Sequence, residues 1–447
     1  MKILLGGIPL GCDNIGDEAI LAGVCAMLRE SVPGAGITVC TADPATGPLL
    51  GVETAPLHGF SGAPRRRDLA AFAELARRHD AFVWCGATGL SDYPHAGLDL
   101  LEAARRAGTP AFVWGVGMDD EPNPVFFKAH GRRKALLGAF GLVGAYESLL
   151  RRRLARRIRA VLPRCRGVWV RDSESAAALA RHGFSGAAVA ADSAIMLARG
   201  AAPRPHAAPS GRPVLGLCFS AQRQISDFAG AKALLQTVGA AGCGFLGIPM
   251  NPKTDRAPLE ALGVRCIDGT TPEAVMDAAS RCDAVLSSRL HLLILAACAG
   301  TPGIGIARGS KVANWLANFG EKPVGDVQSC DWDAAARAAL HLLADRGDWD
   351  RRRAAAFAAL RARFDAARAE FAARMRAGTY RHAEFAEVLP HAEFAEFLPH
   401  AEFAEFLPHA DGAEFFDAAG AADTRPGLLG LLGFLGFLGC LGFLGTP

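Results

Sequence analysis

Short apolar runs alternate with helical stretches along most of this chain, and this alternation limits the fold more than any other feature of the sequence. In the first part, runs typical of buried strands are separated by stretches with the spacing of helices. Such alternation predicts a mostly parallel sheet covered by helices on both faces. The strand candidates here are 2–5, 37–41, 81–84, 111–114, 167–170 and 187–190, and the helix candidates are 17–28, 67–78, 98–107 and 173–181.

A second series with the same alternation begins after 198–213, a segment rich in Pro, Ala and Gly that has the composition of a linker. At 447 residues the chain is also longer than one hydrophobic core usually supports. We therefore expect an α/β protein with two domains, 1–197 and 214–330, a cleft between their sheets, and closing helices over 331–380. The strand candidates of the second series are 214–219, 244–248, 265–267, 284–286 and 303–306, and its helix candidates are 227–238, 258–262, 272–280, 290–299 and 311–319.

The last part of the chain, 381–447, has a different composition. Three copies of a nine-residue repeat fill 382–408, and an uncharged apolar run of 18 residues covers 428–445. About 18 apolar residues can just span a bilayer, so one interpretation is a membrane tail anchor. Glycine at every third position weakens a helix, however, and the repeat is typical of an expanded or frame-shifted DNA sequence. We favour a low-complexity, disordered tail.

Charge is distributed unevenly. The formal net charge is +3, but the residues before 381 carry 46 basic and 35 acidic side chains, a net charge of +11. A basic body suits an anionic substrate or an anionic membrane surface. Because 41 of the 48 basic residues are Arg, a single Arg is weak evidence of a site, whereas a Lys is stronger. The Arg runs at 65–67 and 151–157 are most simply solvated faces. Membrane-surface binding is the alternative for the second run, which lies in an insertion-like region over 123–163.

The twelve cysteines are scattered, with no CxxC pair. This pattern argues against a zinc site or a disulfide framework and favours a reducing cytosol. No cluster of His, Cys and carboxylate residues has the spacing of metal ligands, so we expect no metal. Residues 1–5 lead directly into a strand pattern without a signal peptide. We expect a cytoplasmic protein, or one at the inner face of the membrane.

The strongest candidate for chemistry is the sequence SSRLH at 287–291, which follows the apolar run 284–286. Arg289 and His291 then lie at a junction between a strand and a helix, where open α/β sheets bind their ligands. An Arg can hold a carboxylate or phosphate through two parallel hydrogen bonds, and a His can move a proton near neutral pH. The pair predicts chemistry on an anionic small molecule.

The first strand is followed by a Gly-rich turn over 6–18 that enters a helix. Gly7 and Gly16 permit close backbone approach, and Asn14, Asp17 and Glu18 add polar groups at the end of the sheet. The turn has no GxGxxG pattern, and the chain has no Walker A sequence. The alternative interpretation is that Asp17 and Glu18 only favour the helix N-terminus.

The turn CGATG at 85–89 also follows a strand. Gly86, Thr88 and Gly89 would allow a ligand near the backbone, although a simple tight turn is the favoured alternative. Cys85 is expected to be a small buried residue rather than a nucleophile.

Three further junctions carry polar residues. Asp172 can cap the helix that begins at 173, whereas Arg171 at the end of a buried strand is harder to explain in that way. Asp192 follows the 187–190 strand and is either another cap or a contact in the cleft. Lys311 lies in the first turn of a helix, where its charge opposes the helix dipole, so a ligand contact is expected.

Together these blocks resemble the polysaccharide pyruvyl transferase family. The resemblance covers about 1–320 and rests on NIGDEAIL at 14–21, the turn at 85–89, RDSES at 171–175 with AADSA at 190–194, and the block 287–306 with Lys311 after it. The first and last blocks are the most specific. The chain departs from the family at 85–89, where a run of at least three glycines is usual, and the tail has no counterpart.

The resemblance implies two Rossmann-like domains facing across a cleft, similar to the GT-B fold. It implies transfer of a carboxyvinyl unit from phosphoenolpyruvate, without a cofactor, to a sugar diol of a cell-surface polysaccharide or its polyprenyl-diphosphate-linked precursor. The products are a pyruvate ketal and phosphate. Arg171, Arg289 and His291 align with the family's donor-binding and catalytic positions. The first domain would be the acceptor side and the second the donor side, and Asp17 is the preferred base over Glu18 or Asp172.

Two alternatives stay open at this point. One is a GT-B glycosyltransferase that uses a nucleotide sugar, because the same cleft suits such a donor. The other is an inactive relative that binds a glycan.

Overall fold

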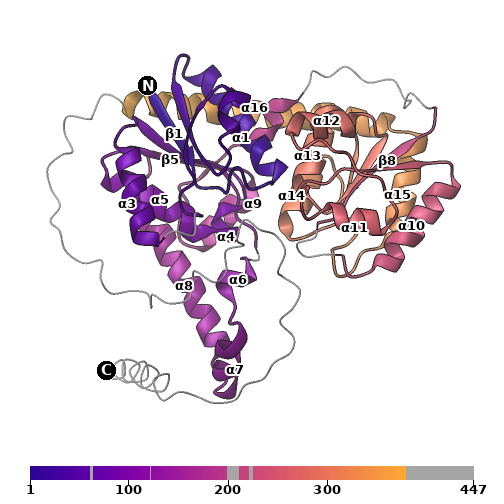
Figure 1. The fold of residues 1–447 in the computed structure, drawn as a ribbon, viewed down its shortest axis with the longest axis horizontal. Coiled ribbons are helices and arrows are strands. Elements are labelled where there is room, and N and C mark those ends of the chain that lie inside the picture. The colour runs from indigo at the N-terminus through magenta and orange to yellow at the C-terminus, as the bar shows by residue number, and fades with distance from the viewer. Residues whose placement is uncertain (61–63, 121, 199–210, 221–224, 379–447) are drawn as a thin grey trace. The chain divides into compact units, whose positions relative to one another are not determined.

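The computed structural model describes residues 1–60, 64–120, 122–198, 211–220 and 225–378. They form two parallel β-sheets, each covered by helices (Figure 1). The predicted α/β class is therefore confirmed. Most of the predicted linker and the whole of the predicted tail, 381–447, lie outside the described residues, and the predicted domain boundaries stay predictions.

The first sheet has the strand order β3-β2-β1-β4-β5-β6-β7, and every pair of neighbours is parallel. The chain moves outward in one direction from β1 through β2 and β3 and in the other from β4 onward. The direction therefore reverses between β1 and β4, which is where such sheets bind ligands. The strands are β1 (Lys2–Gly6), β2 (Gly36–Thr41), β3 (Glu53–Pro56), β4 (Ala81–Cys85), β5 (Ala111–Val116), β6 (Gly167–Val170) and β7 (Ala188–Val189).

Helices connect these strands, and their sequences explain where they begin. Asn14 caps α1 through its side-chain oxygen, which accepts a hydrogen bond from the Gly16 amide at 3.2 Å. Asp172 caps α9 in the same way. The elements are α1 (Ile15–Ser31), α2 (Thr46–Leu50), α3 (Arg65–Ala76), α4 (Gly89–Asp92), α5 (Pro94–Arg106), α9 (Ser173–Arg181) and the 3-10 turns η1 (Leu162–Arg164) and η2 (Ser193–Leu197).

The second sheet has the order β11-β10-β8-β9 and is also parallel. Its order reverses between β8 and β10. The strands are β8 (Val214–Cys218), β9 (Gly244–Gly247), β10 (Ala284–Ser287) and β11 (Gly303–Gly305). The helices are α10 (Phe228–Ala240), α11 (Arg256–Ala261), α12 (Pro272–Ser280), α13 (Leu290–Ala299) and α14 (Ser310–Ala317).

Two strands differ from the sequence-based expectation. The strand predicted at 265–267 is wrong, because only a single bridge joins Cys266 to Gly247. The strand β3 was not predicted. It is a mostly exposed edge strand that ends in Pro56, so it lacks an apolar run that would mark it.

The predicted closing helices are present as α15 (Trp332–Ala344) and α16 (Gly347–Gly378). Helix α16 packs on both α/β units. The Arg353 Nε atom donates to the carbonyl of Ala297 at 2.6 Å, and the Phe371 ring lies against Trp169 and Phe112. The Trp169 Nε1 atom also donates to Glu370 at 3.1 Å. One long helix therefore links the second α/β unit to the first.

The Arg-rich insertion forms α6 (Pro124–Phe127), α7 (Gly131–Ala139) and α8 (Val143–Val161). Helix α8 is anchored by Leu154, Ile158 and Val161, whereas α7 buries no residue. Figure 1 shows α7 at the end of α8 that lies away from the first sheet. Within the described ranges, no helix is long and apolar enough to cross a bilayer, and the apolar run 428–445 lies outside those ranges.

Candidate active site

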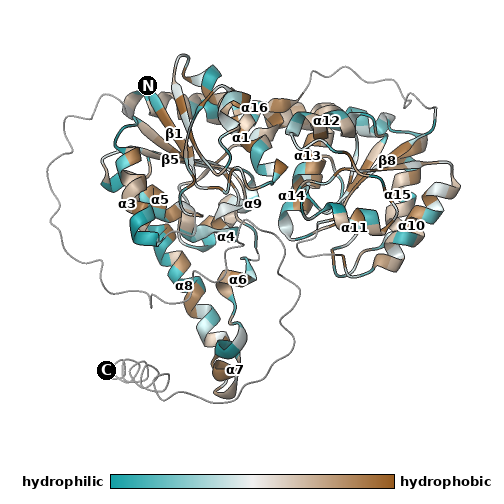
Figure 2. Cartoon of the chain, in the orientation of Figure 1, coloured by the Kyte–Doolittle hydropathy of each residue, from teal (hydrophilic) through white to brown (hydrophobic). Residues whose placement is uncertain are grey.

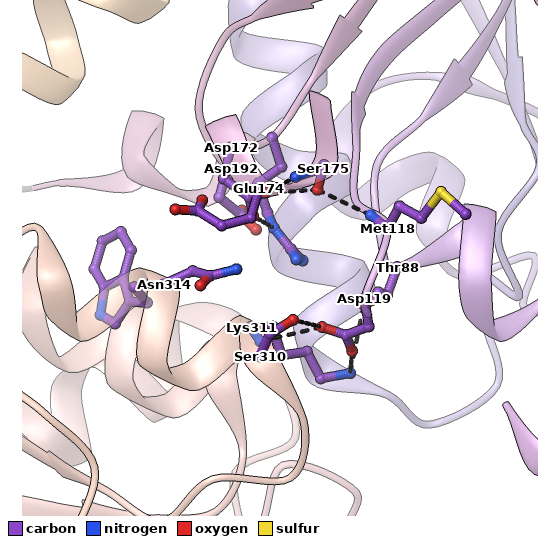
Figure 3. A network of polar contacts seen from close by, with 12 residues as sticks. Thr88, Met118, Asp119, Asp172, Glu174, Ser175, Asp192, Ser310, Lys311 and Asn314 are labelled. Atoms are coloured by element: carbon purple, nitrogen blue, oxygen red, sulfur yellow. Dashed lines mark hydrogen bonds and ion pairs between the residues drawn. The ribbon is translucent and has the colours of Figure 1, made fainter. Parts of the chain in front are cut away.

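Polar side chains gather where the strands of both sheets end, and contacts between the two α/β units join them. The amide of Ile15, at the start of α1, donates to the carbonyl of Met250 at 3.0 Å. Figure 3 shows a second such junction, where Asp119 from the first unit reaches Ser310 and Lys311 from the second. The carboxyl ends of the two sheets therefore contribute to one continuous set of polar contacts.

His291 lies in the first turn of α13, directly after β10. Its Nε2 atom is 3.3 Å from Oδ2 of Asp192. Its imidazole ring lies against the backbone of Gly16, so closely that a Cβ atom at position 16 would overlap the ring. The structure therefore brings Gly16 and His291 together, and the glycine is needed at that position to make room for the imidazole.

Asp192 has both of the roles that the sequence left open. Its Oδ1 atom accepts from the Ala194 amide at 3.0 Å and caps η2, while Oδ2 faces His291. Burial alone would raise the pKa of Asp192, but His291 and Arg171 more than offset that effect and hold the pKa below its ordinary value. Asp192 is therefore an ionised carboxylate beside the imidazole.

Asp17 and Glu18 occupy the first turn of α1. Burial raises the pKa of Asp17 to about 6, although His291 and the hydrogen bond from Asn14 Nδ2, at 2.7 Å, act in the opposite direction. Burial also raises the pKa of Glu18 to about 6, and its Oε1 atom accepts from the Gly11 amide at 2.7 Å. Asp17 is thus a buried carboxylate within the electrostatic reach of His291.

Arg171 is buried at the end of β6, with its guanidinium against the backbone of Gly117. Its Nε atom donates to Oδ2 of Asp172 at 2.9 Å. Nη1 is buried and has no hydrogen-bond partner among the described residues. Asp172 also caps α9, because its Oδ1 atom accepts from the Ser175 amide at 2.8 Å, which is the capping role considered from the sequence. The unpartnered Nη1 gives the site one donor for an anion.

Arg289 is already paired, which the sequence did not predict. Its Nε and Nη2 atoms donate to Oδ2 and Oδ1 of Asp255 at 2.9 and 2.7 Å. Asp255 is fully buried and follows β9 in a polar loop. The two-bond edge of this guanidinium therefore faces a protein carboxylate, and only Nη1 lies outside the pairing. Asp255 could have been suspected only from its position after a predicted strand.

Lys311 is surrounded by oxygen atoms of the first α/β unit. Its Nζ atom lies 3.4 Å from Thr88 Oγ1, 3.6 Å from Asp119 Oδ2 and 3.7 Å from Asp92 Oδ2. Asp119 also caps α14, because Oδ1 accepts from the Lys311 amide at 3.1 Å and from the Ser310 hydroxyl at 3.0 Å. Figure 3 shows Ser310 and Lys311 facing Asp119. Sequence reasoning missed Asp119 and Asp92.

The glycines of the first two turns have different partners from those expected. Cβ atoms at Gly7 and Gly89 would overlap the buried indole of Trp84, so these two glycines make room for a core side chain. Gly86 has a φ of +89° and lies against Ile20. Ala87, which carries a Cβ atom, also has a positive φ of 57°. The turn therefore has a left-handed backbone at two successive residues, Gly86 and Ala87.

Two more residues belong to this region and were not predicted. Arg308 follows β11, and its Nη1 atom donates to the hydroxyl of Ser220, which follows β8. Burial is the main cause that raises the pKa of Tyr93, and the charge of Asp92 adds to it. The charges of Arg289 and Arg308 act to lower this pKa. These interactions place Arg308 and Tyr93 near the same charged groups.

The remaining sequence-based expectations concern metal and cysteine. Among the described residues, no group of three His, Cys, Asp or Glu side chains could hold a metal ion. Cys85 is fully buried, and burial raises the pKa of its thiol, which agrees with the expected structural role. A cavity of about 370 Å³ lined by Arg29, Gly36, Gly47 and neighbouring residues contains none of the candidate site residues.

The fold and the position of the site at the strand ends define a GT-B-like α/β protein. A crystal structure of the glycotransferase of kitacinnamycin is similar to this chain with a TM-score of 0.52 and 14% identity, over 85% of this chain and 99% of the other. The Alr3699/HepE protein of Anabaena, solved with UDP-glucose, gives a TM-score of 0.51 and 15% identity over 84% and 99%. The UDP-GlcNAc 2-epimerase of Neisseria meningitidis, bound to UDP-GlcNAc, gives 0.51 and 12% over 78% and 93%.

The particular family follows from the sequence. Residues 14–310 match the family described as polysaccharide pyruvyl transferase, and the chain belongs to that family. No curated protein matches the chain in sequence. The family resemblance expected from the four sequence blocks is confirmed.

Proposed function

We propose that this protein transfers a carboxyvinyl unit from phosphoenolpyruvate to a sugar diol and forms a pyruvate ketal and phosphate. Family membership supports the transferase class. The observation that carries the specific reaction is the environment of His291, which lies between Gly16 and the ionised Asp192 beside the buried Arg171. A proton donor next to buried cations suits a donor substrate that carries a carboxylate and a phosphate.

Donor binding would use the guanidinium atoms that the protein leaves available. Nη1 of Arg171 is buried without a partner, and a buried unpaired donor costs free energy unless a ligand accepts from it. Nη1 of Arg289 lies outside its pairing with Asp255. Each Arg would therefore contribute one or two hydrogen bonds to an anionic group, rather than the symmetrical two-bond clamp expected from sequence for Arg289.

The chemistry requires two additions at one carbon. The imidazolium of His291 protonates the methylene carbon of phosphoenolpyruvate, and the first sugar hydroxyl adds to the neighbouring carbon and loses its proton to a base. The bond from that carbon to the phosphate oxygen then breaks, and the second hydroxyl adds and loses its proton. One of the two released protons restores His291, and the other leaves with phosphate. A positioned general acid contributes about 10²–10⁴ in rate.

Asp17 is the carboxylate best suited to accept the hydroxyl proton. Its pKa of about 6 lets it ionise near neutral pH while it stays more basic than an exposed carboxylate. Glu18 is bound to the Gly11 amide, and Asp172 is bound to both Ser175 and Arg171. These bonds commit Glu18 and Asp172 to structural roles, so the order of preference deduced from the sequence is kept.

The acceptor is proposed from family membership alone: a cell-surface polysaccharide or its polyprenyl-diphosphate-linked precursor, modified in the cytoplasm. The reaction as written needs no cofactor or metal.

The test is calorimetric titration of the full-length protein with phosphoenolpyruvate and, separately, with UDP-glucose. Wild type and H291A should bind phosphoenolpyruvate, and only wild type should release phosphate when acceptor is added. R289A/D255A should bind it more weakly. The double change is needed because R289A alone would remove the guanidinium group from the buried Asp255 carboxylate, which can cost about 3–5 kcal/mol.

The opposite results identify the two alternatives. Binding of UDP-glucose without binding of phosphoenolpyruvate would identify a nucleotide-sugar glycosyltransferase. Binding of neither, together with retention on a glycan, would identify an inactive relative.

A further inference from the structure

The insertion α6–α8 combines strong positive charge with exposed apolar side chains. Between residues 124 and 161 the chain has ten basic residues and one acidic residue, Glu147. The excess of nine positive charges exceeds the net charge of +3 of the whole chain. Large apolar side chains are also exposed here: Val125 is 53% exposed and Leu136 is 48% exposed. Both properties occur on an insertion whose helix α7 buries no residue.

Some cations of this insertion bind within the protein, whereas several exposed ones form no ion pair in the described part of the chain. Arg157 pairs with Asp99 and Glu102 of α5, which fixes the base of α8. Five other exposed cations form no ion pair with any residue that the structure describes: Lys128, Arg132, Lys134, Arg151 and Arg152. Two of the chain's seven lysines, Lys128 and Lys134, lie in this short segment, so the Arg-rich composition alone does not explain the charge.

The combination of charge and apolar surface distinguishes between kinds of partner. A nucleic acid or an acidic polymer would need the cations but not the apolar side chains. A helix that lies in a membrane interface uses both, with apolar side chains among the acyl chains and Lys or Arg against anionic headgroups. Figure 2 shows hydrophobic and hydrophilic residues next to one another on α7. Helix α7 has no buried residue, so its apolar side chains are not committed to the protein core.

The insertion also leaves the first sheet next to the candidate site. The Asn123 amide donates to the carbonyl of Ser91 at 3.0 Å, and the Asn123 side chain donates to the carbonyl of Asp92 at 3.4 Å. The carboxylate of Asp92 lies 3.7 Å from Nζ of Lys311. Asn123, at the start of the insertion, therefore contacts a residue that lies next to Lys311 of the candidate site.

We propose that α6–α8 is a docking element for an anionic phospholipid surface, with α7 and Leu136 in the interface and the cations of α7 and α8 against the headgroups. Docking there would deliver the candidate site to substrates carried in the membrane. Because this proposal rests only on the insertion, it can be correct or wrong independently of whether the protein uses phosphoenolpyruvate.

The first experiment measures partitioning of the full-length protein onto vesicles of phosphatidylglycerol and phosphatidylcholine, compared with pure phosphatidylcholine. Wild type should prefer the anionic vesicles, and added salt should weaken the binding. R132S/K134S/R152S should lower the partition coefficient about a hundredfold, because each cation near an anionic surface contributes about fivefold. The matched control R66S/R67S/R78S removes three exposed cations of the α3 region and should bind as wild type does.

The second experiment locates the contact and does not depend on how strongly the rest of the chain binds. All six native tryptophans are buried, so L136W adds the one exposed indole. Brominated phospholipid should quench this fluorescence when vesicles are added. L49W is the control, because Leu49 is 65% exposed on α2, a helix that contains no charged residue.

Three results with vesicles would overturn the proposal. The first is equal binding to neutral and anionic vesicles, the second is an equal loss of binding in both triple variants, and the third is equal quenching of L136W and L49W. Binding of wild type to a soluble acidic polysaccharide but not to vesicles would also overturn it and would assign the cations to a polymer partner.

Discussion

The carboxylate of Asp119 accepts a hydrogen bond from the backbone amide of Lys311 at 3.1 Å, and it also lies 3.6 Å from the ammonium group of Lys311. Asp119 follows β5 of the first sheet, whereas Lys311 begins α14 beside the second sheet. One side chain thus caps a helix that is 192 residues distant in sequence and neutralises a cation that would otherwise oppose the helix dipole.

The first prediction concerns this cap. D119A should lower the free energy of unfolding by about 0.5–2 kcal/mol, the usual cost of losing an N-cap. Asparagine is an equally good cap, so D119N should lose much less. Denaturant unfolding of the three proteins measures the difference, and equal stability of D119A and wild type would show that the cap contributes nothing.

The second prediction concerns the contact between Gly16 and His291. In G16A, the new methyl group would overlap the imidazole and displace it, while alanine suits the first turn of α1. Phosphate release should fall at least tenfold and at most by the about 10²–10⁴ that a general acid supplies. G144A is the control, because a Cβ at Gly144 meets no atom within 4 Å. Full turnover by G16A would contradict the role of His291.

The third prediction concerns the left-handed residue in the second turn. Ala87 has a φ of 57°, which costs a residue with a Cβ about 1–2 kcal/mol relative to glycine. Glycine would remove this cost, but it loses more backbone entropy on folding, which offsets part of the gain. A87G should therefore stabilise the protein by about 0.5–1 kcal/mol. A70G, on the exposed face of α3, should instead destabilise it by about 1 kcal/mol. A loss of stability in A87G would mean that the strain is relieved elsewhere.

The fourth prediction concerns the buried carboxyl group of Asp17. Its pKa in the folded protein, about 6, is above its value of about 4 in the unfolded chain. The neutral form is therefore favoured by folding, and its contribution to stability is present below pH 4 and is lost as the pH rises through 6. D17N cannot ionise, so its stability relative to wild type should increase by about 3 kcal/mol between pH 4 and pH 8.

Denaturant unfolding of D17N and wild type at the two pH values checks this result. A constant difference between them would mean that Asp17 is not buried as a neutral acid.

Most of the fold could be predicted because the alternation of apolar runs and helices is a local property of the sequence. The boundaries of β1, β4 and α9 agree closely with the predicted ranges. The failures also have local causes. Glu53–Pro56 pairs with β2 although most of its side chains are exposed, and the 265–267 segment pairs at one residue only. In neither case does the side-chain pattern carry the information that decides pairing.

The candidate site was only partly predictable, because sequence identifies charged groups but not their partners. Arg289 was expected to face a ligand, yet it faces Asp255, which is 34 residues away in the chain. Gly7 and Gly89 correctly indicated a close approach, but the approaching group is Trp84 rather than a substrate. Gly16 shows the reverse case, since the group that approaches it is the candidate catalytic His291.

The indole of Trp84 has a consequence for how the sequence of this turn can diverge. It lies against Gly7 near the start of the chain and against Gly89 and Gly97 shortly after the indole itself. Gly7 is also held by its positive φ, so it must stay glycine whatever occupies position 84. Gly89 and Gly97 have no such backbone requirement. Alanine can therefore replace Gly89 or Gly97 only after Trp84 has been replaced by a smaller residue. The volume of the indole ring thus sets the order in which these substitutions can occur.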